Sequence, residues 1–412
     1  MILVVGAGLS GLACALRLEA AGRDWMLVEA SPEPGGRVAT EVTTEGFRLD
    51  RGFQVLLDSY PTARRLLDFK ALQPRYFQSG ALLAGKDRHP ERLLNPLRHV
   101  GGIRDALRAR FPLREKLMLG AYTALQTLRS DRSLLTQECG WTALEELKRL
   151  CLSGEILESF LRPFFAGVFL DNELGTDASL LRYDLKKFTL GRALLPDRGM
   201  RKIPRQLASR LPAERLRYAS RISSLQRSGD RVSGVVLEGG EVIPCDQLVL
   251  ATDEQTTRRL LGLPAGRAWT EVTTLYFTGG EPLYKGALLV LPSGSSRLVR
   301  HFTDLTSIAP GYAPPGRRLL SATILGSRQG DSADAAKAEI AALFPEFRKW
   351  EFLKEVRVRH ALPSQRPGFG RELLSRRPLP NLVLAGDQVA CASIESALVS
   401  GGAAAEELLK IT

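Results

Sequence analysis

The chain has 412 residues, about twice the length of a typical single domain, so we expect two domains. Hydrophobic residues make up 44% and charged residues 25%, a globular composition that excludes a disordered, collagen-like or repetitive chain. The net charge of +12 indicates a basic surface, but no zinc-finger spacing or helix-turn-helix pattern accompanies it, so we expect no nucleic-acid partner.

The cysteines and histidines carry no pattern of their own. Five cysteines stand far apart without a CxxC pair, and four histidines are widely spaced, so we expect neither a disulfide framework nor a metal site. The sequence has no signal-peptide pattern, and no apolar run approaches the ~18 residues of a membrane span. We expect a cytoplasmic protein, either free or peripheral to the inner face of a membrane, as a monomer or homodimer.

The first 28 residues predict a strand–turn–helix–strand unit. Met1–Val5 is a fully apolar run typical of a buried parallel strand, and Leu12–Ala21 carries small and apolar residues at helical spacing. Trp25–Val28 is a second short strand. The turn between the first two elements reads Gly6-Ala7-Gly8-Leu9-Ser10-Gly11. This GxGxxG pattern between a strand and a helix is typical of dinucleotide binding.

Each residue of that turn has an expected role. Gly6 permits the tight turn out of the strand, Gly8 lets the backbone approach a pyrophosphate, and Gly11 lets the helix pack against the strand. The helix N-terminus, near Leu9 and Ser10, offers free N–H groups and a positive dipole end to phosphates. These residues are the first candidates for cofactor contacts.

An acidic residue closes the second strand. Glu29 follows Val28 at the place where a carboxylate would accept hydrogen bonds from ribose hydroxyls, and Ala30 lies beside it. The carboxylate argues against NADP, because it would repel the 2′-phosphate. The pair therefore joins the predicted site.

The next segment distinguishes FAD from NAD. Gly35 and Gly36 would allow close backbone approach, and Arg37 would place a cation near the pyrophosphate. The segment that follows ends in Gly52 and Phe53, which we assign to the same site. A plain surface arginine is the alternative interpretation of Arg37, but the combined pattern favours FAD.

A related pattern occurs near the C-terminus. Asn381–Ala385 predicts another buried strand, which leads into Gly386-Asp387. Asp387 could bond the ribityl chain or a phosphate-bound water. A helix starting near Ser393, Ile394 and Ser396 could present N–H groups to the electron-rich edge of a reduced flavin. A plain packing helix capped by Ser393 is the alternative, but it does not account for the preceding Gly-Asp pair.

Three further strands are predicted in the middle of the chain. Leu216–Ser224, Val232–Leu237 and Gln247–Ala251 are separated by glycine turns. The last of them ends on small residues at Ala251, as a strand passing under a dinucleotide would.

These motifs together resemble those of the flavin-containing amine oxidase and phytoene desaturase superfamily over most of the chain. The resemblance implies an α/β fold with a Rossmann-like FAD-binding domain assembled from residues 1–75, 196–265 and 355–412. Residues 76–195 and 266–354 would form an α+β substrate domain of sheet and helices. It also implies that the backbone of Ile222 contacts adenine. FAD would be bound non-covalently, because no cysteine stands at the attachment position of some members.

Two positions bear on the branch of the superfamily. Amine oxidases resembling this chain carry an aromatic residue where Ser393 stands, and often a lysine in the strand matching Thr270–Phe277, which has Thr273 or Thr274 instead. The resemblance favours a desaturase-like enzyme that removes hydride from an apolar isoprenoid or carotenoid-like substrate and passes electrons to oxygen or a quinone. An amine oxidase and a non-catalytic FAD-binding protein or partner subunit are the alternatives.

The substrate segments are rich in apolar residues. Leu93–Leu128 has Leu, Ala and Arg at helical spacing with a break at Pro112, and Leu157–Leu170 carries four phenylalanines. The aromatic stripe is either core or the lining of an elongated pocket that opens onto a membrane surface. No catalytic residue is assigned. His301 and His360 lie in strand-like stretches and fit structural roles better than catalytic ones.

Overall fold

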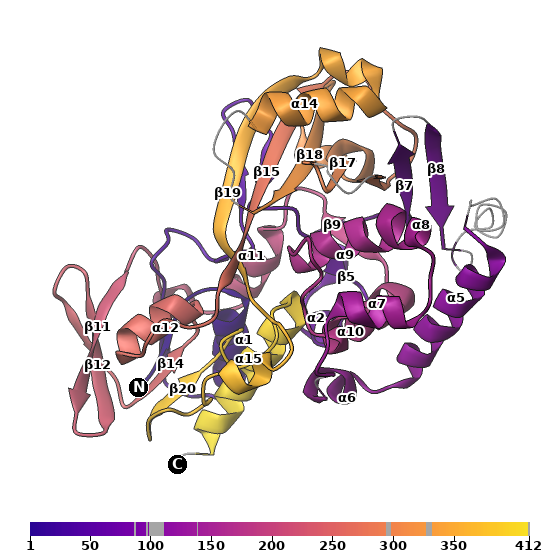
Figure 1. Cartoon of the computed structure of the whole chain (residues 1–412). Helices are drawn as coiled ribbons and strands as arrows, with labels where there is room; N and C mark the ends of the chain where they lie inside the picture. The colour runs from indigo at the N-terminus through magenta and orange to yellow at the C-terminus, as the bar shows by residue number, and fades with distance from the viewer. Residues whose placement is uncertain are drawn as a thin grey trace.

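The computed structural model describes residues 1–85, 88–95, 98, 111–137, 139–293, 298–326 and 332–410. Two sheets dominate these residues. Figure 1 shows a parallel sheet with helices α1 (Leu9–Ala20) and α15 (Ile394–Leu409) at the bottom, and a larger sheet covered by α14 (Ser332–Leu343) at the top. The predicted α/β fold class is confirmed.

The lower sheet has five parallel strands in the order β10-β2-β1-β14-β20. Their bounds are Ile2–Val5 for β1, Trp25–Val28 for β2, Leu216–Arg217 for β10, Gln247–Leu250 for β14 and Leu382–Leu384 for β20. The sheet thus draws strands from distant parts of the chain.

Side chains alternate across this sheet, so both faces are buried. Ile2 and Val4 pack in the cluster that contains α1 and α15, whereas Leu3 and Val5 pack against the strands of a small antiparallel sheet on the other side. That sheet consists of β11 (Ile222–Ser228), β12 (Arg231–Leu237) and β13 (Val242–Pro244). Burial on both faces explains why β1 reads as a continuous apolar run.

One strand prediction was wrong. The run Leu216–Ser224 forms two strands, β10 and β11, which belong to different sheets. Ala219, between them, has φ +50°, a left-handed conformation that ends the first strand and redirects the chain.

The upper sheet has seven strands in the order β19-β15-β18-β17-β16-β7-β8. Their bounds are Glu351–Pro363 for β19, Trp269–Gly279 for β15, Arg318–Leu325 for β18, His301–Asp304 for β17, Leu289–Pro292 for β16, Gly80–Gly85 for β7 and Arg88–Leu94 for β8. Side chains such as Phe277 and Phe302 pack with Ile340 of α14 on one face. The opposite face carries Val272 and His301 toward the interior of the molecule. The predicted domain boundary at residue 355 falls within β19, which runs past it without interruption.

A group of helices packs beside this sheet (Figure 1). They are α5 (Leu113–Leu128), α6 (Asp131–Thr136), α7 (Ala143–Arg149), α8 (Gly154–Ile156), α9 (Arg162–Phe169) and α10 (Ala178–Leu190). A π-helical turn at Leu157–Leu161 joins α8 to α9 without a break, so Pro163 lies inside a continuous helix, directly after the π turn. The predicted helical stretch Leu93–Leu128 starts in strand β8, lies partly outside the described residues, and is helical from Leu113.

Short elements complete the connections. They are β3 (Thr40–Val42), β4 (Arg48–Asp50), β5 (Leu56–Leu57), β6 (Pro74–Tyr76), β9 (Ala193–Pro196), α2 (Pro61–Leu66), α3 (Phe69–Leu72), α11 (Lys202–Ala208), α12 (Glu254–Leu261) and α13 (Leu305–Ile308). Every helix within the described ranges is too short or too polar to serve as a membrane span.

Candidate functional site

A cavity of about 1480 Å³ runs from the carboxyl ends of β1, β2 and β14 to the helices beside the upper sheet. Carboxyl ends of parallel strands are the usual place for ligands in α/β folds. One half of the cavity is lined by the glycine-rich turns, and the other half by apolar side chains of α5, α9 and α10.

The structure brings most of the predicted cofactor residues onto the wall of this cavity. Those that line it are Gly6, Gly8, Leu9, Ser10, Glu29, Ala30, Gly35, Gly36, Arg37, Gly52, Phe53, Ile222, Ala251, Gly386, Asp387, Ser393 and Ile394. Gly11 and Ser396 lie behind the wall. The Ser396 N–H donates to the Ser393 side chain at 2.9 Å, so this amide is engaged in the helix cap.

Two of the three glycines in the first turn, Gly6 and Gly11, could not be replaced without collision. A Cβ on Gly6, whose φ is +104°, would lie 2.8 Å from the carbonyl oxygen of Ala251, and one on Gly11 would lie 1.9 Å from the carbonyl oxygen of Gly6. A Cβ on Gly8, by contrast, would meet nothing within 4 Å. The open space beside Gly8 belongs to the cavity and leaves room for a pyrophosphate.

Glu29 holds the turns around it in place. Its two carboxylate oxygens accept hydrogen bonds from the backbone N–H groups of Ala7, at 2.6 Å, and Ser31, at 2.7 Å. The Gly35 N–H in turn donates to the Ala7 carbonyl at 2.9 Å. A carboxylate has about four acceptor positions, so Glu29 can accept two further hydrogen bonds from ribose hydroxyls.

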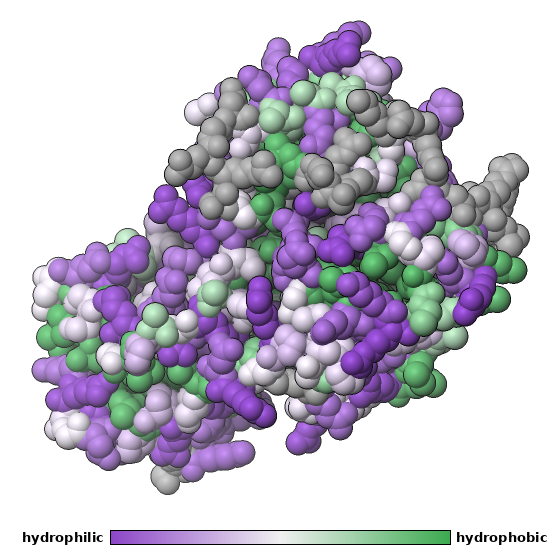
Figure 2. Space-filling model, viewed as in Figure 1, coloured by the Kyte–Doolittle hydropathy of each residue, from purple (hydrophilic) through white to green (hydrophobic). Residues whose placement is uncertain are grey.

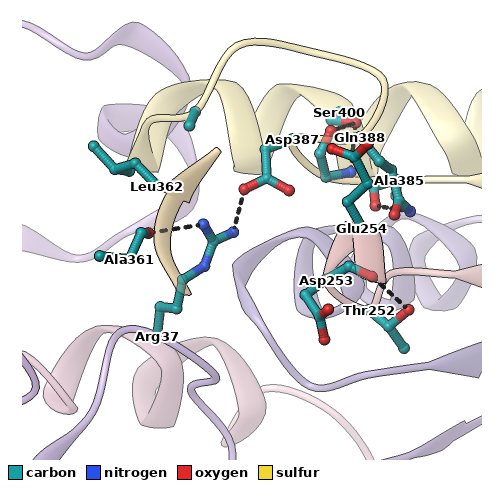
Figure 3. A network of polar contacts seen from close by, with 12 residues as sticks. Arg37, Thr252, Asp253, Glu254, Ala361, Leu362, Ala385, Asp387, Gln388 and Ser400 are labelled. Carbon is teal, nitrogen blue, oxygen red and sulfur yellow. Dashed lines mark hydrogen bonds and ion pairs between the residues drawn. The ribbon is translucent and has the colours of Figure 1, made fainter. Parts of the chain in front are cut away.

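Arg37 and Asp387 join two ends of the chain across the cavity. The Arg37 guanidinium lies 2.6 Å from Oδ2 of Asp387 and donates to the Ala361 carbonyl at 3.2 Å (Figure 3). The Asp387 side chain is 4% exposed. Its Oδ1 has no hydrogen-bond partner among the described residues, so a buried acceptor remains for a ligand.

We predict that Arg37→Gln lowers the free energy of unfolding of the cofactor-free protein by about 1–2 kcal/mol, because the buried Asp387 carboxylate loses its cation. Urea unfolding followed by circular dichroism measures this change. The double variant Arg37→Gln/Asp387→Asn should recover most of the loss, since neither group is then left unpaired. Additive effects of the two substitutions would contradict the coupling.

The loop that carries Asp387 is fixed on several sides. The buried Arg267 donates to Glu254 at 2.8 Å and to the Asp387 carbonyl at 2.6 Å. The Gly386 N–H donates to the Ser400 hydroxyl on α15 at 2.9 Å. The Asp387 carboxylate is therefore held in one position before any ligand arrives.

The second half of the cavity is mainly apolar, with Lys116, Thr123 and Thr127 of α5 as polar lining residues. It is lined by Leu93, Leu94, Phe111, Leu119, Ile156, Phe160, Leu161, Phe164, Phe165, Val168, Phe169, Leu170, Leu180, Leu185, Phe188 and Leu289. Of the predicted aromatic stripe, Phe165 and Phe169 are buried in the core, while Phe160 and Phe164 are only half-buried. The stripe thus serves both as core and as cavity lining.

The histidines noted in the sequence differ in their surroundings. His301 on β17 lines the cavity, its ring centroid 4.9 Å from that of Phe53, and burial lowers its pKa to about 4. Both ring nitrogens are buried and lack partners within the described ranges, and a Cβ on Gly167 would collide with Nδ1. His301 is therefore an uncharged ring that packs tightly against Phe53 and Gly167. His360 is exposed and packs against Trp269.

Sequence reasoning missed Asp184. This residue of α10 lines the apolar half of the cavity, and burial raises the pKa of its carboxyl to about 7. Leu180 and Phe188, one turn before and one turn after it, line the same wall. An acidic residue in the middle of an apolar i, i+4, i+8 row was the signal in the sequence.

The parallel sheet, its glycine turn and the cavity at its carboxyl edge form the kind of site at which α/β folds bind their ligands. The chain belongs to the flavin-containing amine oxidoreductase family, whose sequence pattern matches residues 9–409. It is a flavin-using oxidoreductase, and the resemblance found in its motifs is confirmed.

The chain is similar in sequence to a phytoene dehydrogenase and a phytoene desaturase, and similar in fold to a putrescine oxidase. The chain is 30% identical to a phytoene dehydrogenase of Streptomyces griseus over 372 residues, covering 77% of this chain and 71% of the relative. It is 24% identical to a 15-cis-phytoene desaturase of Capsicum annuum, covering 99% of this chain and 78% of the relative. The structure of a redesigned putrescine oxidase is similar in fold, with TM-score 0.75, 16% identity and coverage of 99% and 98% of the two chains.

Proposed function

We propose that this chain is an FAD-dependent oxidoreductase that removes two hydrogens from an apolar, isoprenoid or carotenoid-like substrate. The observation that carries the proposal is the continuity of the glycine-lined half of the cavity with an apolar half lined by phenylalanines and leucines. A ligand in the second half would reach the redox cofactor through a mainly apolar environment. Oxygen or a quinone would then take the electrons.

The residues on the glycine-lined wall fit FAD. The open side of Gly8 suits the pyrophosphate, the spare acceptor positions of Glu29 suit a ribose, and the unpartnered Oδ1 of Asp387 suits the ribityl chain or a bound water. When bound, FAD supplies the hydride acceptor. The protein positions the substrate and excludes water. We further propose that the parallel sheet with its flanking pieces forms the FAD domain and the upper sheet with α5–α10 the substrate domain.

Non-covalent binding is supported by the state of the cysteine at the cavity. Cys391 lines the wall, but burial raises the pKa of its thiol to about 11, and its sulfur lies 2.9 Å from the Ser396 hydroxyl. Since the thiolate is the reactive form, this thiol is a poor nucleophile toward a flavin ring.

Two observations favour a lipophilic substrate over an amine. Ser393, which stands where amine oxidases resembling this chain carry an aromatic residue, caps α15 and offers no ring to a cationic amine. Neither Thr273 nor Thr274 lines the cavity. The named relative with the highest identity given above is a phytoene dehydrogenase, which agrees with this choice.

Anaerobic reduction of the bound flavin tests the proposal. The FAD-loaded protein is mixed with phytoene-type polyenes in liposomes and, separately, with a panel of amines, and flavin absorbance is followed. We expect bleaching by a polyene and none by amines. Bleaching by amines alone would support the amine oxidase. A fully loaded protein that no donor reduces would support a non-catalytic FAD-binding subunit.

The outer face of α5 bears on how such a substrate arrives. Leu113, Leu117, Leu125 and Leu128 are 58%, 65%, 57% and 83% exposed, and Gly120 of the same helix lines the cavity. Figure 2 shows hydrophobic side chains gathered over α5. An exposed apolar row on a helix that also lines the cavity suits a bilayer surface, so we propose peripheral membrane contact here, with substrate entry beside α5.

Replacing Leu117 and Leu128 together by glutamate should weaken binding to vesicles by at least about tenfold, because two apolar side chains lose their burial in lipid. Co-sedimentation with vesicles that contain anionic lipid measures this. Val242→Glu, at an exposed valine on β13, is the matched control and should bind as the parent protein does. Equal binding of all three proteins would exclude α5 as the contact.

A further inference from the structure

We propose that Asp184 is the proton acceptor of the reaction. This inference rests on the proposed function, because the removal of two hydrogens from neighbouring carbons releases one hydride and one proton. The hydride leaves with its bonding pair for the oxidised flavin. The second C–H bond breaks, its electron pair forms the new C=C bond, and the proton passes to a carboxylate oxygen of Asp184.

The position of Asp184 singles it out. Four described acidic residues line the cavity, namely Glu29, Asp184, Asp253 and Asp387. Glu29 and Asp387 belong to the wall with the glycine turns, and Asp253 caps α12 by accepting from the Thr256 N–H at 2.9 Å. Only Asp184, among the residues that the structure describes, places a carboxyl in the apolar half, where an apolar chain would lie.

The carboxyl group of Asp184 is also free to act. No described residue forms a hydrogen bond with it, and this half-buried residue lines the cavity. Lys187, the cation nearest to it on α10, lies 2.5 Å from Asp131 and is paired there. A carboxyl left without a partner in an apolar wall destabilises the fold, and a role in catalysis accounts for its presence.

The other titratable groups of this region are unsuited to accept a proton. His301 lines the cavity, but both of its ring nitrogens are buried and burial lowers its pKa to about 4, so it is a weaker base than Asp184. Burial raises the pKa values of the Tyr60 and Tyr183 hydroxyls and of the Cys391 thiol, so these groups stay protonated. Glu395 accepts hydrogen bonds from the Thr62 and Ala63 N–H groups of α2.

The surroundings of Asp184 make its carboxylate a stronger base than usual. Desolvation raises its pKa toward neutrality, and Lys187 opposes that shift only in part. The charge of Asp184 in turn raises the pKa values of Tyr60, Tyr183 and Cys391, which places these groups around it. A base whose pKa lies near the working pH is both available and effective.

The test is an Asp184→Asn variant, with Glu173→Gln, an exposed carboxylate in the loop after α9, as the matched control. In anaerobic stopped-flow mixing with a polyene that reduces the parent protein, flavin reduction in Asp184→Asn should be at least a hundredfold slower. The rate of flavin reduction in the parent and the control should rise with pH around pH 7, as Asp184 loses its proton. The rate in Asp184→Asn should not show this rise. The dissociation constants of FAD and polyene should not change.

A second measurement needs neither cofactor nor substrate. Folding raises the pKa of Asp184 from its ordinary value of about 4 to about 7. Between these two pH values the folded protein keeps a proton on Asp184 that the unfolded chain has released. The free energy of unfolding of the parent protein therefore falls as the pH rises from about 4 to 7. The urea midpoint of Asp184→Asn should therefore exceed that of the parent increasingly between pH 5 and pH 8, while Glu173→Gln shows no such trend.

The outcomes separate the two proposals. If the parent protein oxidises a polyene and Asp184→Asn does so at the same rate with the same pH profile, the proton acceptor is excluded and the proposed function stands. If no polyene reduces the flavin of the parent protein, both the proposed function and the role of Asp184 are rejected. Loss of polyene binding in Asp184→Asn would make Asp184 a binding residue and overturn the catalytic assignment.

Discussion

A Gly8→Val variant is expected to fold normally and to bind FAD at least about a hundredfold more weakly, a loss of about 2.7 kcal/mol. Gly8 caps α1 with φ −69° and ψ 175°, an extended conformation that valine adopts readily. A Cβ there meets no protein atom within 4 Å, so the isopropyl group would occupy the cavity itself. The side chain would then fill the space that the pyrophosphate needs.

Two titrations check this prediction. Fluorescence quenching of FAD by the cofactor-free protein gives the affinity, and urea unfolding gives the stability, which should differ from that of the parent by less than about 1 kcal/mol. A Gly8→Val protein that binds FAD as tightly as the parent would falsify the placement of the pyrophosphate beside this turn. An unfolded variant would show instead that the space beside Gly8 is structural.

Gly401→Ala is expected to destabilise the protein by about 3 kcal/mol or more. Gly401 lies where α15 crosses α1, and a Cβ there would stand 2.0 Å from the carbonyl oxygen of Ser10 and 3.1 Å from the Ala13 side chain. The obstacle is backbone, so no side-chain rotation relieves it. Since Ser10 also lines the cavity, separating the helices would disturb the cofactor site as well.

The neighbouring glycine supplies the control. A Cβ on Gly402, on the same helix, would meet nothing within 4 Å. Gly402→Ala should stabilise the protein by about 0.5–1 kcal/mol, because alanine favours the helix. Urea midpoints of the two variants should therefore move in opposite directions. If both substitutions changed stability by the same amount, the close crossing of α1 and α15 would be wrong.

Local patterns allowed much of this fold to be predicted from sequence. The strand at Trp25–Val28 has the predicted bounds, and β1 and α1 differ from prediction by a few residues at their ends. These elements combine a buried apolar run with glycine turns, and both signals are short-range. The same holds for the Gly386-Asp387 turn, whereas the contact of Asp387 with Arg37 was not predicted.

Other features depend on contacts that no local pattern records. The split between β10 and β11 follows from the left-handed conformation of Ala219, which an alanine adopts only when its surroundings impose it. Gly401 and Gly402 are neighbouring glycines in the sequence, and only the approach of Gly401 to Ser10 in the fold distinguishes them. Asp184 lies in the wall of the cavity because α5, α9 and α10, which are separate in the sequence, line the same cavity.

The order of strands in the parallel sheet has a consequence for how the protein folds. Strand β1 pairs with β14, which follows it at a long distance in the chain, and β14 pairs with β20, which follows later still. Pairings between such distant segments form slowly, since a long loop must close first. Until β20 and α15 have been synthesised, the edge of β14 and the apolar side of α1 stay uncovered. A growing chain therefore passes through an aggregation-prone intermediate, and the wall of the cavity is complete only when residues 386–394 are in place.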